Sequence, residues 1–218
     1  MRAAVVSCHV ERPLDDRVWG PFARLQLRRP GGFRIAALMR PPDEEHGESE
    51  SEAAWLSRAR AAAERGPFGL HTHWTSPDHA RPTGSGDPAD RVRDEIAWLR
   101  ARGHDPRFFC GGGWYTDDRV RAVVADAGLV DCTATTFALP YGAEARVVDG
   151  PKPALLPATH SVGMLARATK LPDYVHIYFH DTDLLDRKRA LVLEVALRAL
   201  ALRRPVADLD ELSRVFAR

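Results

Sequence analysis

The stretch Phe68-Gly69-Leu70-His71-Thr72-His73-Trp74 runs from apolar residues directly into two histidines. A short apolar run of this kind predicts a buried strand. Residues i and i+2 of an extended segment point to the same side, so His71 and His73 are expected to face one region together. Residues 75–86 then contain four Pro or Gly residues and are expected to form a long loop.

The same alternation extends over the whole chain. Short apolar runs alternate with amphipathic stretches, which predicts βα units and a mostly parallel sheet. Strands are expected at about residues 3–8, 33–39, 68–70, 108–109, 129–133 and 174–179, with a strand pair within 147–156. Helices are expected at about residues 16–29, 53–64, 87–102, 116–127, 160–168 and 184–202, and from about 208 onward. Six or seven such units predict an α/β fold, a distorted (β/α) barrel of about seven strands. At 218 residues, the chain 1–218 is expected to be a single domain.

Composition excludes several classes of function. Lys and Arg total 31 and Asp and Glu total 30, so the near-neutral charge gives no reason to expect a nucleic-acid partner. Three cysteines are too few for a disulfide framework. The apolar run at the N-terminus is short for a signal peptide, and no run approaches the roughly 20 residues of a membrane span. A cytoplasmic protein without a membrane span is therefore expected, with its oligomeric state open.

Polar residues follow several of the predicted strands. His9 and Glu11 follow the first strand, and His180 follows the strand at 174–179. In parallel α/β folds the carboxyl ends of the strands carry the active site, so these side chains are expected to meet His71 and His73. Two imidazoles and a carboxylate with one coordination position left open are a common catalytic zinc set.

Glu11, His71 and His73 are therefore predicted to hold a divalent metal, with zinc as the expected ion. A water on the open position would have its pKa lowered to about 7 and would act as the nucleophile. His180 could then protonate the leaving group. His79, in the loop after His73, is a less favoured third histidine ligand.

Other polar residues have structural interpretations. His176 alternates with Tyr178 and is expected in the core or behind the site, whereas His104 follows a helix end and is expected to be a surface or capping group. Asp15 and Asp16 are expected to cap the first helix, and Thr116 the fourth.

Five stretches resemble, in order, the motifs of polysaccharide deacetylases of the NodB-homology type, carbohydrate esterase family 4. The stretches are residues 7–11, 69–77, 109–115, 130–133 and 177–181. The resemblance implies a NodB-type barrel and a metal site at Glu11, His71 and His73. It also implies that His9 stands at the position of the general base and that His180 is the general acid.

The resemblance further implies a carbohydrate-binding wall around the loop after the fourth predicted strand. Trp74, Trp114 and Tyr115 would supply apolar walls for a sugar ring. The metal and backbone amides around Gly111, Gly112 and Gly113 would stabilise the oxyanion.

Two positions depart from the family pattern. The family has an Asp base where this chain has His9, and an Arg that orients the base where this chain has Cys110. A carboxylate base uses a cationic partner, whereas a neutral imidazole is disfavoured by one. The paired change is therefore consistent with a working histidine base or with loss of the acid–base pair.

The expected function is hydrolysis of an N-acetyl or related acyl group on an amino sugar or another sugar-linked small molecule. Two alternatives remain open at this point. One is a catalytically inactive, carbohydrate-binding relative. The other is a metal-dependent phosphoesterase on a similar barrel, which would bind two or three metal ions instead of one.

Overall fold

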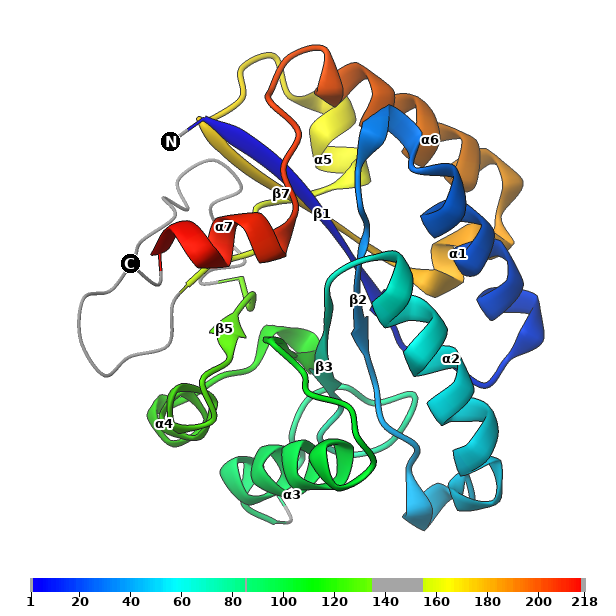
Figure 1. Cartoon of the computed structure of the whole chain (residues 1–218), viewed down its shortest axis with the longest axis vertical. Helices are drawn as coiled ribbons and strands as arrows, with labels where there is room; N and C mark the ends of the chain where they lie inside the picture. Colours follow the sequence, from blue (N-terminus) through cyan, green and yellow to red (C-terminus); the bar gives the residue numbers. More distant parts are fainter. Residues whose placement is uncertain (1, 85, 135–154, 217–218) are drawn as a thin grey trace.

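A single parallel sheet organises the protein, as seen in a computed structural model that describes residues 2–84, 86–134 and 155–216 (Figure 1). Its seven strands lie in the order β5-β4-β3-β2-β1-β7-β6. The strands are β1 Ala3–Val10, β2 Ala36–Met39, β3 Phe68–Thr72, β4 Phe108–Gly111, β5 Val130–Asp131, β6 His160–Ser161 and β7 Tyr174–His180. Every pairing is parallel. The predicted α/β fold, a distorted (β/α) barrel of about seven strands, is confirmed.

Helices surround the outer side of the curled sheet, except that the last helix contributes Leu209 and Leu212 to the cluster inside it (Figure 1). The α-helices are α1 Asp16–Arg28, α2 Glu52–Arg65, α3 Pro88–Ala101, α4 Asp118–Asp126, α5 Val162–Arg167, α6 Arg187–Ala201 and α7 Leu209–Phe216. Short 3-10 turns are η1 Pro30–Gly32, η2 Glu44–His46, η3 Ser49–Ser51, η4 Gly112–Trp114 and η5 Asp181–Leu185. Among the described residues, no helix has the length and apolar character needed to cross a membrane.

Carboxylate caps fix where several helices begin. Asp15 accepts a hydrogen bond from the backbone N–H of Arg17, as predicted for α1. The cap of α4 is Asp117 and not the predicted Thr116, because the Asp117 carboxylate accepts from the backbone N–H of Val120. A carboxylate satisfies a free N–H at a helix start and also complements the helix dipole.

Several predicted elements have different boundaries in the structure, and three of these differences most affect where an element begins. β2 begins at residue 36 and not 33, where Ala36 pairs with Ser7 on β1, because residues 205–207 bond to the backbone of β1 at Ala4 instead. The stretch predicted as a helix from residue 160 first forms β6, paired with β7, before α5 starts. The helix predicted from residue 184 begins as η5, and α6 starts only after the Asp186 cap. Most of the strand pair predicted within 147–156 lies outside the described residues.

Residues 155–159 connect the two edges of the curled sheet. Their backbone N–H groups donate hydrogen bonds to residues at the end of β5 on one side and to β7 on the other. The three bonds run from Leu156 N to Asp131 O at 2.9 Å, from Ala158 N to Cys132 O at 3.0 Å and from Thr159 N to His176 O at 2.9 Å. This short segment therefore closes the barrel where β5 and β6 do not pair directly.

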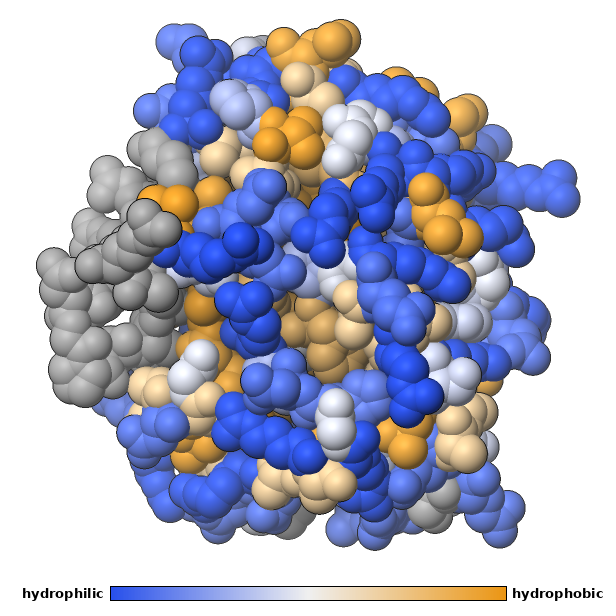
Figure 2. All heavy atoms as spheres, viewed as in Figure 1, coloured by the Kyte–Doolittle hydropathy of each residue, from blue (hydrophilic) through white to orange (hydrophobic). Residues whose placement is uncertain are grey.

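The core has two layers, one on each face of the sheet. The inner cluster fills the barrel with side chains from alternate strand positions, including Val5, Leu38 and Phe108. The outer cluster lies between the sheet and the helices and includes Phe22, Trp55 and Phe109. All eight residues of β1 are buried, as expected for a parallel strand covered on both faces. The surface seen in Figure 2 is mostly hydrophilic, with scattered hydrophobic side chains.

Two histidines outside the predicted site lie in this core. His176 is fully buried, as expected, and its Nε2 lies 2.8 Å from Ser7 Oγ while its Nδ1 lies 2.9 Å from the carbonyl oxygen of Leu156. His104 is also buried, so its predicted surface position is wrong. Its ring packs against Trp55 and Phe68, because the chain turns inward after Gly103.

We expect His176 to contribute to acid sensitivity. Burial lowers the pKa of His176 to about 4 from 6.5. Between these values the unfolded state binds more protons than the folded state, so the free energy of unfolding falls as the pH falls through that window. His176→Asn should remove up to about 1.4 kcal/mol per pH unit of this slope. Urea unfolding at pH 4–7 measures it, and His79→Asn, at an exposed position, is the matched control. Equal slopes in both variants would contradict the assignment.

Candidate metal and catalytic site

One carboxylate oxygen lies among three imidazoles at the carboxyl ends of β1, β3 and β7. Glu11 Oε1 is 3.5 Å from His73 Nε2, 3.8 Å from His71 Nε2 and 3.6 Å from His180 Nε2. Glu11 follows β1, His71 lies in β3 with His73 just beyond it, and His180 ends β7. The structure therefore brings together four residues that the sequence singled out from three distant segments.

Backbone carbonyls fix the orientation of the two β3 histidines. His71 Nδ1 lies 3.0 Å from the carbonyl oxygen of Cys110, and His73 Nδ1 lies 2.8 Å from that of Pro77. A carbonyl oxygen only accepts, so Nδ1 carries the proton in each ring. In the neutral ring Nε2 then presents a lone pair, and the two Nε2 atoms face each other at 3.2 Å.

This donor set fits a divalent transition metal. Two imidazole lone pairs and a carboxylate oxygen converge without a proton between them, and a shared cation would stabilise them. Tetrahedral zinc with bonds of about 2.0–2.1 Å spaces its ligand atoms about 3.3–3.4 Å apart. The observed separations are 3.2–3.8 Å. Nitrogen donors favour zinc over magnesium or calcium, and Nδ1–H bonds to carbonyls are the usual outer contacts of ligating histidines.

A second group of possible ligands, His9, His71 and Cys110, also lies within 4.8 Å of one another. The rings of His9 and His71 are stacked, with centroids 4.5 Å apart and an interplanar angle of 25°. Ring lone pairs lie in the ring planes, so those of two stacked rings do not converge on one ion. The rings of His71 and His73 cross at 73°. The geometry therefore favours the group formed by Glu11, His71 and His73.

Glu11 and His71 carry different charges at neutral pH. Burial raises the pKa of Glu11, but the His71 and His73 imidazoles outweigh burial and hold that pKa well below its usual range. Burial lowers the pKa of His71 to about 4. At neutral pH the site therefore combines an ionised carboxylate with a neutral His71, the states that a metal ion needs in its ligands.

His9 is enclosed and contacts Cys110. It is 2% exposed, and its ring is stacked between those of His71 and Tyr178. His9 Nε2 lies 3.5 Å from Cys110 Sγ. Burial, then the neighbouring His71 and His180, lower the pKa of His9 well below its usual value, and burial raises the pKa of the Cys110 thiol. Both groups are therefore neutral at pH 7.

His180 is the most accessible histidine of the cluster. Its side chain is 35% exposed, and its Nδ1 lies 3.9 Å from Asp183 Oδ2. The next residue, Asp181, is buried and accepts from the backbone N–H of Arg12 at 2.9 Å. Burial raises the pKa of Asp181 to about 6. Asp181 thus ties the end of β7 to the segment that carries Glu11.

An aromatic pair lies beside His9. The ring of Trp114 is 5.2 Å from that of His9 and 4.6 Å from that of Tyr178. Trp114 adopts a positive φ of 60°, which is uncommon for a residue other than glycine. Sequence reasoning singled out Trp114 and missed Tyr178. The signal was available, because Tyr178 precedes His180 by two positions on one strand and so lies on the same face.

The remaining predicted wall residues pack against each other. Trp74 is 6% exposed, its Nε1 donates to the carbonyl oxygen of Gly112 at 3.2 Å, and its ring meets that of Tyr115 edge-on. A side chain at Gly112 would place its Cβ 2.5 Å from the carbonyl oxygen of Thr72. Gly113 has a φ of 58°, and a Cβ there would meet the Arg81 side chain. Both glycines therefore have a packing requirement, and their role at the oxyanion stays a prediction.

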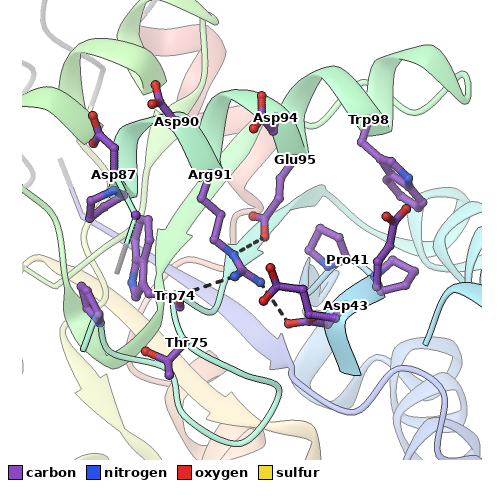
Figure 3. A pocket seen from close by; sticks show the side chains of 16 residues that line it. Pro41, Asp43, Trp74, Thr75, Asp87, Asp90, Arg91, Asp94, Glu95 and Trp98 are labelled. Atoms are coloured by element: carbon purple, nitrogen blue, oxygen red, sulfur yellow. Dashed lines mark hydrogen bonds and ion pairs between the residues drawn. The ribbon is translucent and has the colours of Figure 1, made fainter. Parts of the chain in front are cut away.

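A cavity of about 770 Å³ opens next to this region (Figure 3). It lies between η2, α3 and the loop after β3, and Trp74 and Thr75 form part of its wall. The candidate metal ligands Glu11, His71 and His73 are not among its lining residues. His79, the less favoured histidine ligand, is exposed in the loop and belongs to neither group of possible ligands in the described chain.

Comparisons with known proteins identify the fold. No protein-family model and no curated protein sequence matches the chain. A solved structure assigned as a polysaccharide deacetylase from Mycobacterium smegmatis matches with a TM-score of 0.62 and 14% identity, over 99% of this chain and 90% of that one. The chain thus shares its barrel fold with that structure.

Two further structures match at similar levels. A family 4 pseudoenzyme from Bacillus anthracis has a TM-score of 0.61 and 10% identity, over 97% of this chain and 65% of that one. A 4-alpha-glucanotransferase from Thermococcus litoralis has a TM-score of 0.61 and 12% identity, over 98% of this chain and 38% of that one. The chain thus spans less than two thirds of these two proteins. At these identities the likeness concerns the fold.

We expect Gly112→Ala to lower the free energy of unfolding by about 1–3 kcal/mol, because the added methyl group meets backbone at the Thr72 carbonyl. Urea unfolding measures the change. Gly163→Ala is the matched control, since its nearest contact is the flexible Arg167 guanidinium at 3.8 Å. A Gly112→Ala protein as stable as this control would show that the loop has room to move.

Proposed function

We propose that the protein is a metal-dependent hydrolase that removes an N-acetyl or related acyl group from an amino sugar or sugar-linked molecule. One observation carries the proposal: Glu11 Oε1, His71 Nε2 and His73 Nε2 converge at 3.2–3.8 Å with both Nδ1 atoms turned to carbonyls. Support comes from the fold, which is shared with a structure assigned as a polysaccharide deacetylase.

Glu11, His71 and His73 would hold the metal, with zinc favoured by the nitrogen donors. A zinc ion there would supply Lewis-acid activation of water and of the amide carbonyl. The carboxylate of Glu11 lowers the net charge of the site, and the carbonyls of Cys110 and Pro77 keep the two imidazole rings in place. These contacts prepare the site before substrate arrives.

His180 is suited to protonate the leaving amine. Amide hydrolysis breaks the C–N bond, and the departing nitrogen must gain a proton. The His180 side chain is partly exposed and lies close to Glu11 on one side and Asp183 on the other. It can therefore reach both solvent and substrate and hold a proton at Nε2.

His9 is the candidate proton acceptor. Its neutral state at pH 7 is the state that a base requires, although its low pKa makes it a weaker acceptor than a free imidazole. The contact with Cys110 places the two departures from the family pattern side by side. Trp114 and Tyr178 form an aromatic surface beside His9 that could stack against a sugar ring.

A second candidate function is carbohydrate binding without turnover. It is favoured by one observation, the enclosure of His9 with its Nε2 directed at a thiol and its side chain almost inaccessible. The similar fold of a family 4 pseudoenzyme is consistent with this alternative.

Elemental analysis of the purified protein tests the metal site. We expect about one zinc per chain in the wild type and none in His71→Ala/His73→Ala, because removing two of three ligands leaves a single donor. His79→Ala is the matched control and should keep its zinc. Two or three equivalents per chain would favour the phosphoesterase alternative. No metal after added zinc would overturn the hydrolase proposal.

Acetate release from acetylated amino-sugar oligomers tests the chemistry. We expect His180→Asn to lower kcat by about 10²–10⁴-fold with unchanged zinc content, since a general acid contributes about that much. His79→Asn should retain the wild-type rate. Sugar-induced thermal stabilisation of a zinc-loaded wild type that releases no acetate would support binding without turnover.

A further inference from the structure

We propose that the outer face of α6 binds an anionic lipid bilayer, with its apolar side chains in the interfacial layer and its basic side chains on the lipid headgroups. This inference does not depend on the hydrolase proposal. The inner face of α6 is part of the core, because Leu193, Leu197 and Leu200 are buried in the outer cluster. The helix lies on the outside of the barrel and packs beside α5 (Figure 1).

The exposed face of α6 carries only basic and apolar side chains. Single exposed apolar side chains are common on proteins, whereas a continuous group of them marks an interaction surface. The group does not end with the helix, because the C-cap residue Leu202 is 90% exposed. The exposed residues within α6 are Arg187, Lys188, Arg189, Leu191, Val192, Val195, Arg198 and Ala199.

The exposed apolar side chains form a stripe along the helix. Leu191, Val195 and Leu202 are spaced by four and then seven residues, which places them on one side of an α-helix. They are 63%, 55% and 90% exposed. Arg187 and Arg198 are three helical turns apart and lie next to this stripe. At 1.5 Å per residue the stripe is about 17 Å long, with cationic groups beside it.

Much of the positive charge on this face is not neutralised. The single acidic residue of α6, Glu194, is 15% exposed and pairs with Arg28 and Arg198. Within the part of the chain that the structure describes, the side chains of Arg187 and Lys188 have no hydrogen bond or ion pair. These two cations are therefore available to an anionic partner.

An anionic bilayer complements this combination of side chains. Its surface is negatively charged and its interior is apolar, so long basic side chains can reach the headgroups while Leu191 and Val195 enter the interface. A second copy of α6 does not complement it. Pairing the helix with itself in either direction would bring basic side chains together, and like charges across an interface are unfavourable. A nucleic acid offers phosphates without an apolar layer.

The basic end of this face lies beside the candidate site. Arg189 pairs with Asp183 at 3.0 Å, and Asp183 Oδ2 lies 3.9 Å from His180 Nδ1. Asp186, the acidic residue before the helix, accepts from the backbone N–H groups of Lys188 and Arg189 as its cap. A protein bound to a membrane through α6 would therefore hold His180 near the lipid surface.

Vesicle flotation of the full-length protein tests the proposal. The probes are vesicles of phosphatidylcholine alone and vesicles in which about one third of the lipid is phosphatidylglycerol, which is anionic. We expect partitioning into the anionic vesicles to be at least about tenfold stronger at low salt, because each basic side chain near such a surface adds to binding. The difference should shrink at high salt, since ions screen exposed charges.

An apolar double variant locates the effect on the stripe. Leu191→Gln/Val195→Gln should lose at least about tenfold in partitioning into anionic vesicles, because two side chains no longer enter the interface. Val215→Gln is the control, since it replaces an exposed apolar side chain on α7. Glutamine is a good helix former and all three positions are exposed, so melting followed by circular dichroism should show folded proteins.

A charge double variant locates the effect on the basic end. Arg187→Gln/Lys188→Gln should also lose about tenfold and should reduce the salt dependence. Arg60→Gln/Arg93→Gln is the control, because it removes the same charge from exposed positions on α2 and α3.

Three results would overturn the proposal. They are equal partitioning into both kinds of vesicle, no binding to either kind, and equal losses in the α6 variants and their controls. Sedimentation velocity without vesicles adds a fourth. A dimer that Leu191→Gln/Val195→Gln abolishes would assign this face to a second copy of the chain and overturn the lipid proposal.

Discussion

The convergence of three proton acceptors at the end of β3 is the constraint on which the site depends. The carbonyls of Cys110 and Pro77 take the Nδ1 protons of His71 and His73, and this leaves both Nε2 lone pairs beside Glu11. Lone pairs at such separations repel unless a cation lies between them. The surrounding structure holds this arrangement through close packing of the β3 and β4 ends, where Gly112 leaves no room for a side chain against Thr72.

The candidate acid–base residues, His9 and His180, differ from each other in their exposure to solvent. His9 and Cys110 contact each other in an enclosed space, whereas His180 remains partly exposed. Only the His9 and Cys110 side chains are fully buried here, whereas Trp114, Tyr178 and His180 are partly exposed. A proton can therefore reach His180 from solvent more readily than it can reach His9. This asymmetry agrees with a hydrolase and also explains why binding without turnover is the main alternative.

Much of the fold could be predicted from the sequence because parallel βα units leave strong local signals. The apolar run before His71 and the buried strand before His180 both end where the structure places the site. The strand boundaries could be predicted less well from the sequence. The reason is that the extents of β2 and β6 are set by their neighbours on the sheet and not by their own residues. The burial of His104 depends on the rings of Trp55 and Phe68, which are distant in sequence.

The candidate site, like the fold, could be predicted from the sequence only in part. Pairs separated by two residues, such as His71 with His73, reveal a shared direction, and the same rule would have found Tyr178. The stacking of His9 on His71 and its contact with Cys110 join three different strands, so no local pattern records them. The cavity beside Trp74 likewise combines η2 with α3, and neither segment alone indicates a cavity.

The closure of the barrel by residues 155–159 has a mechanical consequence. Three backbone hydrogen bonds join the two sheet edges there, whereas β1 and β7 pair over seven positions. Regions held by few backbone hydrogen bonds open at a lower free energy than the core, so this seam and the two-position pairing of β4 with β5 should open before the central strands. β1, β3 and β7 would remain in one continuous sheet during such an opening, because the seam lies at the far edge. The barrel could therefore open locally at residues 155–159 while the histidine cluster stays assembled.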